Sequence, residues 1–164
     1  MDQANTEQLH PADFEQRTKE QIANLIFLAK HFQKRIVEET GGNKGMRDEA
    51  ALESAIAAPF ATYFGEDLHI SVFEKASALM RSLSLNHPFV DGNKRTSLGM
   101  TALFLFEHGY GFKEDISDDA IADFCISVAS GNKKLGEISS WLQSTTDRAS
   151  SRSFKAIMQQ LGEV

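Results

Sequence analysis

The sequence predicts a single all-α domain: a bundle of about six helices with one short hairpin or loop. Apolar residues recur at spacings of three and four over most of the chain, which is the pattern of amphipathic helices. No strand-rich region interrupts this pattern. The 164 residues are enough to enclose one hydrophobic core, so one domain is expected.

The first two helices are marked by their apolar faces and by their ends. The first is predicted over residues 14–40 and ends at Gly41-Gly42. The second is short: Asp48 can cap its start, and Pro59 prevents its continuation. The apolar faces of the two helices are formed by Leu25, Leu28, Phe32, Ile36, Leu52, Ala55 and Ile56.

Residues 60–69 are aromatic and β-branched around a glycine and have no helical period, which predicts an exposed loop or small hairpin. A third helix follows, because Ser71 and Glu74 form the pattern of a capping box. Apolar residues continue at helical spacing as far as Asn86. This helix therefore leads the chain directly to His87.

The run TSLGMTALFLFEHGY after residue 95 is apolar almost all the way round, which indicates a helix enclosed by others. Gly109 ends it. Ser117 can cap a further helix, and Gly131-Asn132 precedes another. The inward positions of these two helices are Ile121, Phe124, Cys125, Val128, Leu135, Ile138, Trp141 and Leu142.

The composition divides the chain into three parts. Residues 1–13 form an N-terminal tail, residues 14–142 the helical domain, and residues 143–164 a polar linker with a short amphipathic helix. The linker is predicted from the abundance of Ser, Thr, Asp and Arg after Gln143. The final helix is predicted from the spacing of Phe154, Ile157 and Leu161.

Charge and composition exclude several classes of function. The 17 Lys and Arg residues against 23 Asp and Glu give a net charge of −6, so no overall field attracts nucleic acid or anionic lipid. No apolar run approaches the roughly 20 residues of a membrane span, and no signal peptide pattern opens the sequence. The lone Cys125 fits a reducing compartment. A cytoplasmic protein without direct nucleic-acid or membrane partners is expected.

Residues 87–95, HPFVDGNKR, gather an unusual set of chemical groups, and we call them the signature segment. Pro88 ends the third helix and biases His87 away from the helical region, so its imidazole is expected at the edge of a turn. Gly92 and Asn93 tolerate positive φ and let backbone N–H groups converge at the start of the next helix. Such an arrangement binds anions.

The adjacent cations Lys94 and Arg95 favour a polyphosphate, because a planar guanidinium and a point charge can bind several oxygens together. Asp91 is either their structural counter-ion or a carboxylate ligand for Mg²⁺, and we favour the metal role. Taken alone, His87 would be a helix-end histidine without a role. Lys94 and Arg95 would then be solvated charges, at a cost of about 0.3–1 kcal/mol each against the helix dipole.

The signature segment resembles that of the Fic/Doc family, whose Fic form is HPFx[D/E]GNGRxxR. Lys94 stands where AMP-transferring Fic enzymes have a glycine, and Leu98 stands where they have a second arginine. Both departures are features of the Doc branch, the death-on-curing toxins of toxin-antitoxin modules. The resemblance extends from about Ile22 to the GEISSWL segment and so covers most of the chain.

The resemblance implies a helical Fic fold and a toxin that transfers the γ-phosphate of ATP to a threonine of elongation factor Tu, arresting translation. His87 would be the general base and Asp91 the Mg²⁺ ligand. Asn93, Lys94 and Arg95 would bind the phosphates, and Gly92 would keep the anion site open. Residues 60–69 would be a flap that aligns the target by strand addition, and Phe89 would anchor the loop in the core.

Two other functions stay open at this point: AMP transfer to a protein hydroxyl, and a non-catalytic module that binds a nucleotide or a partner. Self-inhibiting Fic enzymes carry [S/T]xxxE[G/N]. The stretch from Thr62 to Glu66 has that spacing, but Asp67 follows it. A separate Phd-like antitoxin is therefore the expected partner.

Overall fold

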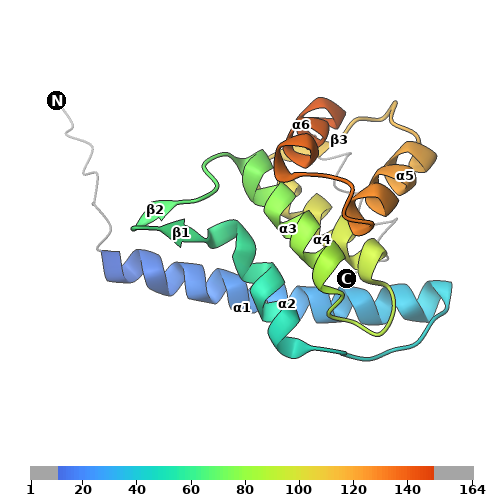
Figure 1. Cartoon of the computed structure of the whole chain (residues 1–164), viewed down its shortest axis with the longest axis horizontal. Helices are drawn as coiled ribbons and strands as arrows, with labels where there is room; N and C mark the ends of the chain where they lie inside the picture. The colour runs from blue at the N-terminus through green and yellow to red at the C-terminus, as the bar shows by residue number, and fades with distance from the viewer. Residues whose placement is uncertain (1–10, 150–164) are drawn as a thin grey trace.

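The computed structural model describes residues 11–149, and over this range it confirms an all-α fold of six α-helices with two pairs of short strands (Figure 1). The helices are α1 (Pro11–Thr40), α2 (Glu49–Ala57), α3 (Val72–Asn86), α4 (Asn93–Glu107), α5 (Asp118–Ala129) and α6 (Leu135–Thr145). The 3₁₀ turn η1 (Ala58–Phe60) follows α2. The strands are β1 (Thr62–Tyr63), β2 (Glu66–Asp67), β3 (Tyr110–Phe112) and β4 (Thr146–Arg148).

The predicted helix ends are confirmed where a capping side chain marks them. The Asp48 carboxylate accepts the Ala51 N–H at 2.9 Å and starts α2. Ser71 and Glu74 form the expected capping box of α3. Ser117 accepts the Ala120 N–H and starts α5. The exception is α1, which begins at Pro11 rather than at residue 14.

The core is centred on α4, which α3, α1 and α5 surround as its apolar sequence predicts (Figure 1). Met100, Phe104 and Leu105 of α4 are at most 1% exposed. The long helix α1 crosses beneath the bundle and contributes Leu25 and Phe32 to the same core. None of the helices in residues 11–149 combines the length and apolar character needed to cross a membrane.

The strand pair β3–β4 was not predicted. Where a linker was expected from Gln143, α6 continues to Thr145, and residues 146–148 pair antiparallel with β3. Thr146 is 5% exposed, and the Arg148 guanidinium lies 4.7 Å from the Tyr110 ring centre. Strands of three residues are too short to show an alternating pattern. The polar composition that resembled a linker belongs here to an edge strand.

The predicted amphipathic helix over residues 154–161 and most of the N-terminal tail lie outside the described residues. The division of the chain into tail, domain and C-terminal segment therefore stays a prediction.

The loop or hairpin expected over residues 60–69 is a hairpin, β1–β2. Thr62 pairs with Asp67 and Tyr63 with Glu66. Phe64 and Gly65 both have positive φ, which is the backbone of a two-residue hairpin turn. An ion pair of 2.7 Å between Asp67 and Lys75 ties the hairpin to the N-terminal end of α3.

Candidate active site

The signature segment forms the connection between α3 and α4, the helices that pack against each other at the centre of the fold. His87 terminates α3 with φ 45° and ψ 56°, a left-handed conformation that is strained for a residue with a side chain. The proline that follows favours leaving the right-handed helical region, as expected. The backbone nevertheless turns left-handed rather than extended. The half-buried imidazole therefore lies at a sharp turn.

Residues 42–48 hold the signature segment from one side by main-chain hydrogen bonds. The Pro88 carbonyl accepts the N–H groups of Arg47 and Asp48 at 2.8 and 3.0 Å, and Val90 N–H donates to the Gly45 carbonyl at 3.0 Å. The sequence identified this stretch only as a turn-rich connection between helices. In the structure it is one wall of the site.

The side chain of Asn93 is engaged within the signature segment. Its side-chain oxygen accepts the Phe89 N–H at 3.0 Å, and its side-chain nitrogen donates to the Phe89 carbonyl at 2.9 Å. The Phe89 side chain is buried in the core, as expected for an anchor. The Asn93 amide thus closes the loop on itself. Its backbone N–H, in the first turn of α4, is the group that it offers to an anion.

Sequence reasoning missed Gln33, a polar residue of α1 that is only 4% exposed. Its side-chain nitrogen donates to the Asp91 carbonyl at 3.1 Å and connects the signature segment to α1. The available signal was its position between Phe32 and Ile36 on the apolar face. A polar side chain there needs a buried hydrogen-bond partner.

Gly92 is the N-cap of α4 and has φ 78°. A Cβ at this position would lie 3.3 Å from Cγ2 of Val37, closer than most real contacts. Both the conformation and the space therefore favour glycine.

Asp91 is oriented by the main chain. Its Oδ1 accepts the Gly92 N–H at 2.6 Å, and its Oδ2 accepts the Asn43 N–H at 3.4 Å. A Cβ on Gly42 would overlap this carboxylate, which explains the glycine there. The nearest Arg95 nitrogen is 3.9 Å from Oδ1, too far for a hydrogen bond. A counter-ion role alone would therefore leave the Asp91 carboxylate oxygens free to accept further ligands.

No cluster of three or more His, Cys, Asp or Glu side chains in residues 11–149 can enclose a metal ion. A site built entirely from side chains is thus absent from this part of the chain. Mg²⁺ commonly uses one or two carboxylates and completes its octahedron with water and phosphate oxygens. The half-buried Asp91 carboxylate, fixed beside the cations of α4, fits that second kind of site.

The N-terminus of α4 is open and positive. Gly92 supplies no side-chain cap, and the first turn holds no acidic residue. The first-turn N–H groups have no partner within the helix, and the exposed Lys94 and Arg95 lie beside them. Burial raises the pKa of the Cys125 thiol to about 11, and the charge of Lys94 acts in the opposite direction. The Lys94 charge is therefore close enough to α5 to act on the Cys125 thiol. The donor set fits a phosphate group.

The structure does not bring the hairpin to this site. The β1–β2 pair lies beside the N-terminal end of α3, whereas His87 follows its C-terminal end (Figure 1). The 15 residues of α3 separate them by about 22 Å at 1.5 Å per residue. Alignment of a target by this hairpin stays a prediction that the observed geometry does not support.

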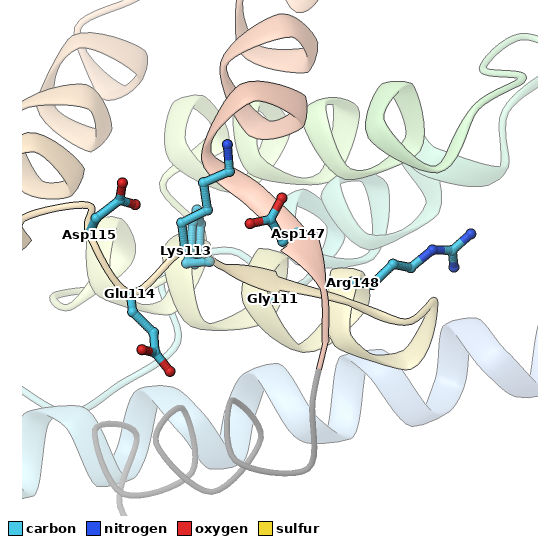
Figure 2. Close-up of a pocket in the computed structure, with 7 residues that line it drawn as sticks. Gly111, Lys113, Glu114, Asp115, Asp147 and Arg148 are labelled. Atoms are coloured by element: carbon cyan, nitrogen blue, oxygen red, sulfur yellow. The ribbon is translucent and has the colours of Figure 1, made fainter.

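A separate pocket of about 480 Å³ opens at β3–β4 and contains none of the signature residues. Its charged side chains include Lys113, Asp115 and Asp147. Figure 2 shows these three on one side of the strands, while Glu114 and Arg148, which also line the pocket, point away from them. A binding pocket needs polar groups that converge on one ligand. The chemistry is therefore assigned to the signature segment.

Comparison with known proteins identifies the family of the chain. A model of the Fic/DOC family matches residues 26–105, a range that includes the whole signature segment. The chain is also 37% identical over 102 residues to Toxin Doc of Mycolicibacterium smegmatis. The matched region covers 62% of this chain and 78% of that protein. On the strength of this similarity, the chain belongs to the Fic/Doc family.

Proposed function

We propose that this protein is a Doc-type toxin, a protein-modifying transferase that moves the γ-phosphate of ATP to a threonine hydroxyl of a protein target. Elongation factor Tu is the expected target, and arrest of translation the expected result. The similarity to Toxin Doc supports the toxin role. The observation that carries the proposal is the open N-terminus of α4 with Lys94 and Arg95 beside it.

The terminal phosphates of ATP would lie against the first turn of α4. The backbone N–H groups there point at an anion, and the helix dipole favours negative charge. Lys94 and Arg95 would neutralise the charge that spreads over the phosphoryl oxygens during transfer. Asp91 would hold Mg²⁺, which supplies further charge neutralisation when bound.

His87 would act as the general base. Its imidazole would take the proton from the threonine hydroxyl, and the hydroxyl oxygen would form a bond to the γ-phosphorus. The bond between that phosphorus and the β–γ bridging oxygen would break, releasing ADP. The short, strained turn at His87 supports this role, because it holds the imidazole within the same loop as Asp91 and Gly92.

A Phd-like antitoxin is the proposed partner. The relationship to Toxin Doc supports a toxin-antitoxin module, and the sequence holds no complete self-inhibition motif. A cytoplasmic location follows from the proposed target.

The test is to incubate the protein with elongation factor Tu, Mg²⁺ and ATP labelled at either the α or the γ position. We expect label in the target only from γ-labelled ATP, with release of ADP. His87→Ala should lower the rate by about 10²–10⁴-fold, the contribution of a positioned base. His31→Ala, on α1 and outside the signature segment, is the matched control and should retain the rate.

The other outcomes distinguish the alternatives. Label from α-labelled ATP would establish AMP transfer instead. Nucleotide binding without transfer from either position, together with toxicity that survives His87→Ala, would identify a binding module.

A further inference from the structure

A groove of about 340 Å³ lies between the N-terminal half of α1 and the end of α4. Leu25 and Leu28 of α1 form its apolar floor, and Glu107 of α4 borders it. Two large apolar side chains of α1 are exposed, Phe14 by 62% and Phe27 by 69%. This surface lies at the C-terminal end of α4, whereas the proposed anion site is at its N-terminal end. The proposed transferase activity does not use it.

The described chain ends beside this groove. Ala149 N–H donates to the Gly109 carbonyl at 2.9 Å, and Gly109 follows Glu107 by two positions. Figure 2 shows β4 running from the end of α6 toward the level of α1. Ala149, the last described residue, therefore lies close to Glu107 at the border of the groove.

The lengths of the segment and of the groove agree. Residues 150–153 can span up to about 13 Å when extended. A helix over residues 154–161 would be about 12 Å long, and the stretch of α1 from Arg17 to Leu28 is about 16 Å long at 1.5 Å per residue. A segment tethered so closely has an effective concentration in the millimolar range.

The chemistry of the segment also matches the groove. Phe154, Ile157, Met158 and Leu161 share one face at helical spacing. Two basic residues, Arg152 and Lys155, stand at the near end of the segment. The charged side chains that line the groove are Glu20, Glu107 and Arg17, so its net charge is negative.

From these observations we propose that residues 150–164 of this chain dock in cis along the α1–α4 groove, with the face of Phe154, Ile157 and Leu161 against Leu25 and Leu28. The occupant is the chain's own C-terminal segment rather than a second copy or another protein. The proposal is independent of the transferase activity, so its tests do not measure activity.

The first test is the labelling of single cysteines on α1 in the full-length protein. Cys125 is a suitable silent background, because its thiol is buried and its pKa is raised to about 11. Asn24→Cys lies in the groove, and Lys34→Cys lies on the exposed surface of the same helix. We expect maleimide to label position 24 about tenfold more slowly than position 34, the protection that a docked segment gives.

A tail variant completes this test. Ile157→Asp combined with Leu161→Asp should raise the labelling rate at position 24 to that at position 34, and leave position 34 unchanged. Equal rates at the two positions in the native chain would overturn the proposal. An unchanged difference between them in the tail variant would overturn it as well.

A second measurement does not depend on any destabilising change. A spin label at Gln160→Cys in the ¹⁵N-labelled full-length chain should broaden the amide resonances of residues 17–28 and of Glu107. Broadening of other surfaces only would overturn the proposal. In a mixture of spin-labelled unenriched chain and ¹⁵N-labelled chain without a label, broadening of residues 17–28 would place the segment on a second copy and overturn docking in cis.

Discussion

The two central helices α3 and α4 are both 15 residues long, yet their N-termini are built in opposite ways. The start of α3 is closed. Ser71 accepts the Glu74 N–H at 3.1 Å, and the Glu74 carboxylate accepts the N–H groups of Ser71 and Ile70 at 2.9 and 2.8 Å. The first turn of α4 follows a glycine N-cap and has two cations and no acidic residue, and the Asp91 carboxylate accepts the N–H of the N-cap itself rather than one from the first turn.

We interpret the start of α4 as a place where the proposed phosphate binding takes the place of helix capping. Helices α2, α5 and α6 also have acidic residues in their first turns: Glu49, Asp118, Asp119 and Glu137. A side-chain cap contributes about 1 kcal/mol, and α4 goes without it. Departures from the usual rules of helix capping and charge are expected at functional sites. At α4 the compensation that we propose is a bound phosphate.

Among changes at the two helix starts, the largest expected effect is the loss of ATP affinity on removing the cations of α4. Lys94→Ala and Arg95→Ala should each weaken ATP binding by about tenfold to 100-fold, because a hydrogen bond to a charged group contributes about 1.5–3 kcal/mol. Stability should not fall, since both charges oppose the helix dipole. Calorimetric titration with ATP and Mg²⁺ and thermal unfolding measure the two effects. Lys75→Ala on α3 is the control, and an equal loss of affinity there would remove the contrast between the helices.

Gly92→Ala should lower both stability and activity. A left-handed conformation costs a residue with a Cβ about 1–2 kcal/mol, and this Cβ would also press on Val37. Gly131→Ala is a matched control, because Gly131 has φ 76° and nothing within 4 Å of the added Cβ.

Chemical denaturation and phosphate-transfer assays compare the two glycine variants. Gly131→Ala should lose only the conformational part of the stability and keep full activity. Equal activity of the two variants would show that the shape of the α4 start is unimportant.

Ser71→Ala should lower the free energy of unfolding by about 1 kcal/mol, the usual effect of removing an N-cap. Phosphate transfer should not change, because this cap lies at the end of α3 far from His87. Ser54→Ala, on the exposed face of α2, is the control for loss of a hydroxyl. A fall in activity without a fall in stability would contradict the division of roles.

The smallest effect concerns pH. Hydrogen bonds from the Ser71 and Ile70 N–H groups hold the pKa of Glu74 below its ordinary value. A lowered pKa in the folded state adds stability above the unfolded pKa of about 4.3. That contribution is lost as the pH falls through the folded pKa. Unfolding measured below neutral pH should therefore be less pH-dependent in Glu74→Gln, whereas Glu53→Gln controls for loss of a surface charge.

Much of the fold could be predicted because its determinants are local. Helical spacing and the caps Asp48, Ser71 and Ser117 lie within a few residues of the ends that they define. The residue types of the signature segment indicated a phosphate site for the same reason.

What the sequence did not reveal depends on contacts between distant segments. The partner of Gln33 lies 58 positions away, and the hydrogen bonds of residues 42–48 to Pro88 and Val90 involve the main chain, which leaves no mark on residue type. The hydrogen bonds between the Asn93 side chain and the Phe89 backbone were not predicted either, and the phosphate-binding role of Asn93 stays a prediction.

The wall formed by residues 42–48 contains two kinds of position: some have no room for a side chain, and others are free to vary. Gly42 and Gly45 face Asp91 and Val90 too closely for a side chain, but Asn43 and Lys44 are exposed. Since main-chain groups attach this wall, exchanges at Asn43 and Lys44 would change the exposed rim while the signature segment keeps its shape. Under the proposed function, selectivity for the target and transfer chemistry could then evolve separately.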